Sequence, residues 1–431
     1  MIGHSVPLWI VLPALAVFGA FVGRLLNKCI QQFPHHDLLR DQLRALTSTD
    51  VSLGKCSCQP ASTDRLPIVG WLTGFGRCHS CRRRTFREVP IVEFVTAILF
   101  AVVYWLEVPV GADASIRDTV LLPHHRLNGP EVIDLWDPIV WFHLRYALHM
   151  VMICSLIVAT AIDLRYRIIP DGSTLPAITV AFAASLIFGQ LFIVPIWFQD
   201  VHWVKINLLP ILPESLQPWF APWDASEFIQ RSPHWHGLLV SAAGAVVGAG
   251  SVWTVRIVGH WALKQEAMGF GDVILMGMIG SVIGWQPVLV VFMLAPTLAI
   301  FGAIINWVAH RDNEIPYGPF LSAATVILLV TWPVLWPLAK RFFDMGTFLL
   351  VTIVLMVFFL AVSLQFVQII KRMLGISFEH DEEDEWSTGD HLMYYGQERP
   401  DEQTGQWPIP QWQGNRTGQG LKQQHDWKHG Y

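Results

Sequence analysis

The sequence predicts an all-α polytopic membrane protein: a bundle of about eight or nine transmembrane helices with a small cysteine-containing cytoplasmic domain between the first two spans. Two observations support this prediction. Of the 431 residues, 53% are apolar and only 15% are charged, a balance that a soluble core of this length does not reach. Several apolar runs also approach the roughly 20 residues that cross about 30 Å of hydrocarbon as a helix, and a helix satisfies its own backbone hydrogen bonds in lipid.

The spans follow from the apolar runs. We place them at residues 7–27, 90–108, 138–162, 174–197, 236–257, 272–285, 286–308, 319–339 and 347–370. Residues 1–27 have no basic amino-terminal region and no small-residue cleavage site, so we interpret them as a retained first transmembrane helix rather than a removed signal peptide. The run at 272–285 is short enough for a half-membrane helix.

The distribution of basic residues predicts the orientation and the domains. Residues 28–89 are rich in Arg and Lys, which is typical of a cytoplasmic segment. Residues 109–137 and 198–235 carry few basic residues and are expected to be outer loops of a transmembrane domain at 90–372. The polar, acidic tail at 373–431 is predicted to be disordered and cytoplasmic. The lipid bilayer is the expected environment, and the formal net charge of −5 gives no support for a nucleic-acid partner.

Two aspartates stand at the ends of spans that meet the same face. The third span runs inward and ends at Asp163, whereas the sixth begins inside at Asp272. A charged side chain at membrane depth costs about 3 kcal/mol on insertion scales, so two of them call for a function. Two adjacent carboxylates share a proton, which lets one act as a base and the other as an acid. Gly269 and Gly271 lack a Cβ and would let an extended substrate backbone approach Asp272.

Each aspartate also has a structural interpretation. Asp272 precedes an apolar helical run, as a helix N-cap does. Asp163, beside Arg165 and Arg167, has the sequence context of an interfacial anchor. Asp171, within an Ile-Pro-Asp-Gly-Ser run, is better explained as a turn or helix-cap residue that opens the fourth span.

Four of the six cysteines lie in the predicted cytoplasmic domain: Cys56, Cys58, Cys78 and Cys81. Two close pairs of thiolates suit a tetrahedral structural zinc ion, which would fold a segment too short for a core. The reducing cytoplasm favours metal over disulfides. The first pair is separated by one residue rather than two, so free thiols and a redox pair stay open as alternatives. Cys29 and Cys154 are expected to be small packing residues in the spans.

Longer motifs around the aspartates resemble those of a known family. They are residues 161–171 (AIDLRYRIIPD), 266–272 (EAMGFGD), 280–285 (GSVIGW) and 315–320 (IPYGPF), with 19–27, 66–72, 77–81 and 90–93 at the front of the chain. Together they resemble the bacterial prepilin peptidases, or type IV leader peptidases, which are GxGD-type membrane aspartyl proteases. The resemblance covers residues 15–325, interrupted by insertions.

The resemblance implies a function and a site. Asp163 and Asp272 would be the catalytic aspartates of a prepilin peptidase in the bacterial inner membrane, which cleaves prepilin or pseudopilin precursors at the cytoplasmic face without a cofactor. The family is often bifunctional, so residues 28–89 would methylate the new amino terminus with S-adenosylmethionine, although they contain no glycine-rich nucleotide loop. Two departures stand out: Ile274 occupies the position of a common family lysine, and Cys56 and Cys58 are too closely spaced.

Functions of other classes stay open at this stage. A transporter should show ionisable residues in mid-span positions and broken helices in symmetric halves, whereas these spans are mostly free of charge. A catalytically inactive membrane scaffold with the same fold is the remaining alternative. Cleavage of a prepilin-like peptide would distinguish a scaffold from a protease.

Overall fold

The computed structural model describes residues 7–36, 38–47, 66–73, 75, 77, 88–108, 138–197, 199–223, 225–263, 268–309 and 316–373. Within these ranges the regular structure is helical, and seven helices are long and apolar enough to cross a membrane. These are α1 (Leu8–Gln32), α4 (Glu88–Glu107), α7 (Pro138–Tyr166), α8 (Asp171–Phe188), α11 (Pro233–Leu263), α13 (Trp285–Ala309) and α16 (Phe348–Met373). The prediction of an all-α polytopic membrane protein is confirmed.

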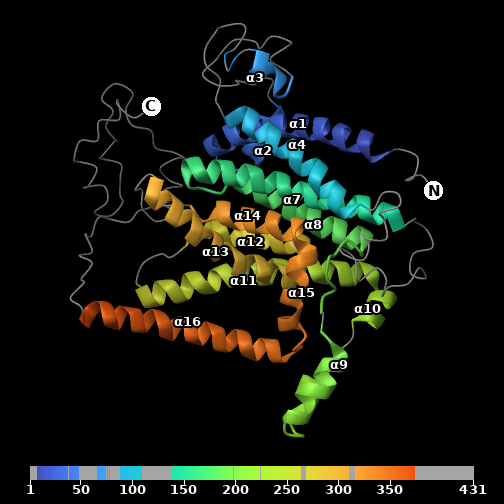
Figure 1. The fold of residues 1–431 in the computed structure, drawn as a ribbon, viewed down its shortest axis with the longest axis vertical. Coiled ribbons are helices and arrows are strands. Elements are labelled where there is room, and N and C mark those ends of the chain that lie inside the picture. The colour runs from blue at the N-terminus through green and yellow to red at the C-terminus, as the bar shows by residue number, and fades with distance from the viewer. Residues whose placement is uncertain are drawn as a thin grey trace.

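Shorter helices complete the bundle. They are α2 (Leu39–Thr47), α3 (Val69–Thr73), α9 (Val201–Trp203), α10 (Ser226–Arg231), α12 (Phe270–Ile283), α14 (Gly318–Val330) and α15 (Trp332–Phe343). Figure 1 shows α1 and α4 along one edge of the bundle and α16 along the opposite edge, with α7, α8 and α11–α14 between them. Helix α16 exposes its large apolar side chains, Phe358 and Phe359 among them, as a lipid-facing surface does.

The first two spans pack closely through glycines. Gly19 of α1 lies against Ala97 and Phe100, and Gly23 lies against Glu93 and Thr96. Residue numbers rise along α1 as they fall along α4, so the two helices are antiparallel. A Cβ on Gly23 would come within 2.7 Å of the Glu93 Cα. Small residues four apart let two membrane helices approach at backbone distance.

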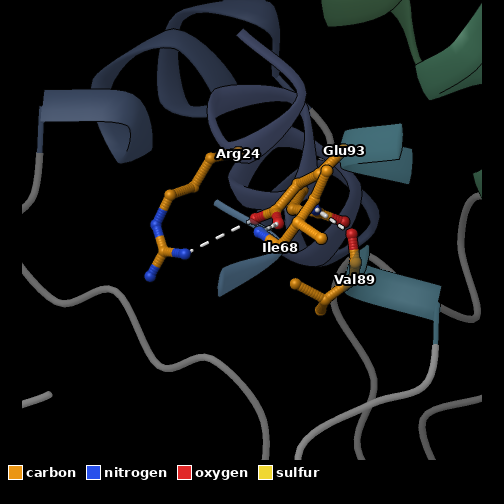
Figure 2. A network of polar contacts seen from close by, with 5 residues as sticks. Arg24, Ile68, Val89 and Glu93 are labelled. Atoms are coloured by element: carbon orange, nitrogen blue, oxygen red, sulfur yellow. Dashed lines mark hydrogen bonds and ion pairs between the residues drawn. The ribbon is translucent and has the colours of Figure 1, made fainter. Parts of the chain in front are cut away.

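A polar network joins this helix pair to residues 66–73, which lie between α1 and α4 in the sequence. Glu93 is 1% exposed and accepts hydrogen bonds from the Ile68 backbone N–H at 2.6 Å and from Arg24 at 3.4 Å. Figure 2 shows these contacts beside Val89, whose carbonyl accepts from the Asn27 side chain at 3.0 Å. The buried carboxylate is thus satisfied by a charge and a backbone donor, and it fixes residues 66–73 against α1 and α4.

Helix α12 is the most enclosed helix of the bundle's centre. Most of its side chains from Asp272 to Ile283 are buried. It lies antiparallel to α11, where Gly244 and Gly280 face each other so closely that a Cβ on either would fall inside the radius of the other's carbonyl oxygen. The short run predicted at 272–285 is therefore a buried helix of the core, and its amino terminus carries Asp272.

Two predicted spans differ from the structure. The span expected at 319–339 is wrong as a single helix, because α14 and α15 meet at a bend of 101°. Pro333, at the start of α15, has no N–H to continue the hydrogen bonds of α14. The span expected to reach residue 197 ends at Phe188, where Gly189 takes a φ of +76°. Within the described ranges the count of candidate spans is seven, or eight if the bent pair is counted as one.

The predicted connecting segments are described in part. Residues 198–235 form short helical turns around α9 and α10, with Trp219 and Trp223 exposed. The predicted outer loop at 109–137, half of the cytoplasmic domain at 28–89 and nearly all of the tail lie outside the described residues.

Candidate active site

Helix α7 positions Asp163 one turn before its end. The helix closes with a hydrogen bond of 2.9 Å from the Arg167 N–H to the Asp163 carbonyl, and Arg167 takes a left-handed φ of +56°, as residues that end helices often do. The Asp163 side chain is only 6% exposed. This burial argues against an interfacial anchor, and Arg165 instead forms an ion pair with Glu88 of α4.

Helix α12 positions Asp272 in its first turn. The N-cap residue is Gly269, and the cap has no side-chain hydrogen bond, so Asp272 is not the cap that its sequence context suggested. Its carboxylate lies where the partial positive charge of a helix amino terminus stabilises an anion. Asp272 is 8% exposed, and it interacts electrostatically with Asp163.

The amino terminus of α14 also lies against the Asp163 carboxylate. The Gly318 backbone N–H donates to the Asp163 carboxylate, and a Cβ on Gly318 would lie 2.5 Å from Asp163 Oδ2. Ile169, which follows α7, packs between the helix starts: it would be 3.0 Å from a Cβ on Gly271 and 3.3 Å from one on Gly318. Three helix ends thus meet around two carboxylates.

The glycines of the motif have different surroundings. A Cβ on Gly269 would meet only Asp272 Oδ2, at 3.8 Å, whereas Gly271 has no room for one beside Ile169. Close packing against Ile169 therefore explains why position 271 is a glycine. The role of Gly269 and Gly271 in the approach of a substrate stays a prediction.

This arrangement can support acid–base chemistry. Two largely buried carboxylates close to each other do not both ionise readily, and an arrangement of this kind favours one protonated and one ionised carboxyl. The ionised member can take a proton from water while the protonated member donates to a carbonyl oxygen. Asp171 lies apart from this chemistry: it is exposed in the first turn of α8.

Sequence reasoning did not assign Gly318 or Tyr317 to the site. Both belong to the 315–320 motif, but their proximity to the aspartates depends on how α14 packs against α7 and α12. A Gly-Pro pair at a helix start has a local explanation of its own. The 315–320 motif marked Tyr317 and Gly318 in the sequence, but it did not indicate what either residue does.

A groove opens next to the site and is lined by Leu164, which follows Asp163, and by Pro319, which follows Gly318. It has a volume of about 670 Å³ and is lined by α1, α4, α7 and α14. Its walls are mostly apolar, with Glu88 and Arg165 at one end. Ser322 of α14 also lines it, with a buried hydroxyl that has no hydrogen-bond partner in the described part of the chain.

The cysteines of the predicted zinc site, Cys56, Cys58, Cys78 and Cys81, lie outside the described residues, so structural zinc stays a prediction. Cys29 is buried, and Cys154 is partly buried and packs against the same apolar cluster, as expected for packing residues. Among described residues, no group of three or more His, Cys, Asp or Glu side chains is placed to hold a metal ion.

Two models of known protein families match this chain. Residues 17–106 match the model of the bacterial peptidase A24 N-terminal domain, and residues 228–305 match that of the type IV leader peptidase family. The second match includes Asp272, and the first covers most of α1 and α4. No solved structure matches the chain.

Three similar proteins from different bacteria share the name prepilin leader peptidase/N-methyltransferase. A prepilin leader peptidase/N-methyltransferase of Pseudomonas putida is 24% identical over 72% of this chain and 86% of its own. One from Aeromonas salmonicida is 24% identical over 76% and 93%, and one from Neisseria gonorrhoeae is 23% identical over 75% and 92%. The two domain matches and the similarity over most of the chain make this protein similar to the type IV leader peptidases.

Proposed function

We propose that this chain is a membrane aspartyl endopeptidase that removes the leader peptide from type IV prepilin or pseudopilin precursors. The observation that carries the proposal is that the helix ends bearing Asp163 and Asp272 lie against the same residues: Gly318 contacts Asp163 and Ile169, and Ile169 also packs against Gly271, which precedes Asp272. The names of the relatives support the substrate class. We assign the protein to the bacterial inner membrane with this end facing the cytoplasm, because residues 28–89, which join the same end of α1 to α4, are rich in Arg and Lys.

The proposed reaction is hydrolysis of one peptide bond. The ionised carboxylate of the pair removes a proton from water, whose oxygen bonds to the carbonyl carbon, while the protonated carboxyl donates its proton to the carbonyl oxygen. The tetrahedral diol then collapses: the C–N bond breaks, the leaving nitrogen takes the proton of the protonated carboxyl, and one diol hydroxyl gives its proton to the other carboxylate as it becomes a carbonyl. The products are a free carboxylate on the leader and a new amino terminus, and the pair returns to its starting state. No metal takes part in these steps.

A cleavage assay tests this function directly. The full chain is purified in detergent and mixed with a prepilin precursor, and mass spectrometry is used to search for a single new amino terminus. We expect one cut, at the end of the leader. An intact precursor after prolonged incubation with folded enzyme would overturn the proposal and would favour the inactive scaffold.

A second activity, N-methylation of the new amino terminus, is favoured by the match of residues 17–106 to the N-terminal domain and by the names of the relatives. We propose that the cysteine-containing segment between α1 and α4 carries it, with S-adenosylmethionine as the methyl donor. Replacing Cys56, Cys58, Cys78 and Cys81 together with Ser is expected to abolish methyl transfer and leave cleavage intact, since the carboxylate pair lies on other elements. Methyl incorporation into cleaved product gives the measurement. Unchanged methylation would show that the cysteines are irrelevant to it.

A further inference from the structure

One buried hydroxyl beside the carboxylate pair has no hydrogen-bonding partner among the described residues. Tyr317 immediately precedes α14, and its ring packs against the main apolar core. Its hydroxyl oxygen is inaccessible to solvent and makes no hydrogen bond. The backbone is held in place, because the Tyr317 carbonyl accepts the N–H groups of Phe320 at 3.0 Å and Leu321 at 3.2 Å.

An unpaired buried hydroxyl is costly. Leaving one without a partner costs about 1–3 kcal/mol, whereas an apolar group of the same shape would avoid that cost. Two other tyrosines of the bundle are satisfied: the Tyr146 hydroxyl donates to the Phe100 carbonyl at 2.9 Å, and the Tyr104 hydroxyl pairs with His143 at 3.2 Å. The Tyr317 hydroxyl therefore needs an explanation other than packing.

The surroundings of Tyr317 supply one. The next residue, Gly318, contacts the Asp163 carboxylate, and the Tyr317 hydroxyl itself interacts electrostatically with Asp272. The start of α14 thus faces both members of the pair. Burial, with the Asp272 carboxylate as a second cause, raises the pKa of Tyr317 to about 12. The hydroxyl keeps its proton and can act as a hydrogen-bond donor but not as a base.

We propose that the Tyr317 hydroxyl is a catalytic hydrogen-bond donor that contacts the carbonyl oxygen of the scissile peptide bond as negative charge develops on it. This inference rests on the proposed peptidase function and adds a third side chain to its site. A preorganised donor in a site shielded from water stabilises the charge that forms in the transition state and needs no reorganisation. The donor keeps its proton throughout, so the proton balance of the two carboxylates is unchanged.

The conservative variant Tyr317→Phe tests this role, because it removes the hydroxyl oxygen and keeps the ring. We expect kcat for precursor cleavage to fall roughly 10- to 50-fold, below the 10²- to 10³-fold typical of a main oxyanion donor, since a carboxyl also donates to this oxygen. We expect KM to stay within about twofold, because an interaction made only in the transition state changes kcat and not substrate affinity. The thermal midpoint should stay equal or rise, since an unpaired buried hydroxyl is removed.

The matched control is Tyr146→Phe. It removes a hydroxyl that does have a partner, and it lies on α7 roughly 25 Å of helix from Asp163. We expect this variant to lower the thermal midpoint and to leave kcat unchanged, the reverse of Tyr317→Phe.

Two results would overturn the assignment of Tyr317. One is a wild-type kcat in Tyr317→Phe. The other is a loss of activity accompanied by a lower thermal midpoint and a raised KM, which would show that the hydroxyl supports the fold. Both are distinct from a failure of the proposed function, in which the wild-type chain itself would not cleave the precursor.

Discussion

Asp272→Asn is expected to reduce precursor cleavage by at least about 10³-fold, and Asp163→Asn should do the same, because catalytic groups that act as one unit fail together. Asparagine keeps the size of the side chain and its hydrogen-bonding oxygen, but it cannot ionise or share a proton. The remaining carboxyl then lacks the partner that would either activate water or protonate the carbonyl. The measurement is the rate at which the new amino terminus appears, followed by mass spectrometry.

The double variant Asp163→Asn/Asp272→Asn sharpens this prediction. If the carboxylates act as one pair, the double variant should be no slower than either single variant. If each made an independent contribution, the losses would multiply. Independent losses would contradict the shared-proton mechanism even if both single variants were inactive.

Asp171→Asn is the matched control. Asp171 carries the same side chain near the same end of the bundle, but it is exposed in the first turn of α8 and is not a side-chain cap. Activity should stay within about twofold of wild type, as is usual for a surface substitution. All variants should insert and elute as the wild-type chain does, because asparagine keeps the size of the aspartate side chain and adds no charge.

The sequence predicted the fold class because it depends on local patterns, whereas the pairing of Asp163 and Asp272 as catalytic groups stays a prediction. Apolar runs define spans, and the order of the spans places the end of α7 and the start of α12 at one membrane face. Hydropathy alone did not reveal the bend at Thr331, because residues on both sides of it are apolar. Pro333 was the only local signal, and a proline does not state the direction of the next helix.

Other features depend on contacts between distant residues. The predicted fourth span ends early at Gly189, whose left-handed φ closes α8. The contact of Gly189 with the backbone of Pro233 and His234 at the start of α11 is not visible in the sequence of 174–197. The same holds for Gly318, which is remote in sequence from Asp163. Its part in the site appears only when α14 packs against α7.

Gly318→Ala is expected to reduce kcat by at least about 100-fold, because a misplacement of about 1 Å at a catalytic group can cost that much. The added Cβ would lie 2.5 Å from Asp163 Oδ2 and 3.3 Å from Asp163 Cγ. The carboxylate must rotate or move away, and it then loses the Gly318 N–H and its alignment with Asp272. The backbone itself tolerates alanine, since Gly318 is not among the glycines with positive φ.

A control separates this local effect from a general effect of glycine replacement. Gly250→Ala adds a Cβ with no heavy atom within 4 Å, so both kcat and the thermal midpoint should match the wild-type values. Gly318→Ala should keep its thermal midpoint within a few degrees, because the contact is with the tip of one side chain, while its kcat falls. Full activity in Gly318→Ala would mean that the Asp163 carboxylate reacts from another position, since the geometry at the start of α14 leaves no room for both the methyl group and the present carboxylate.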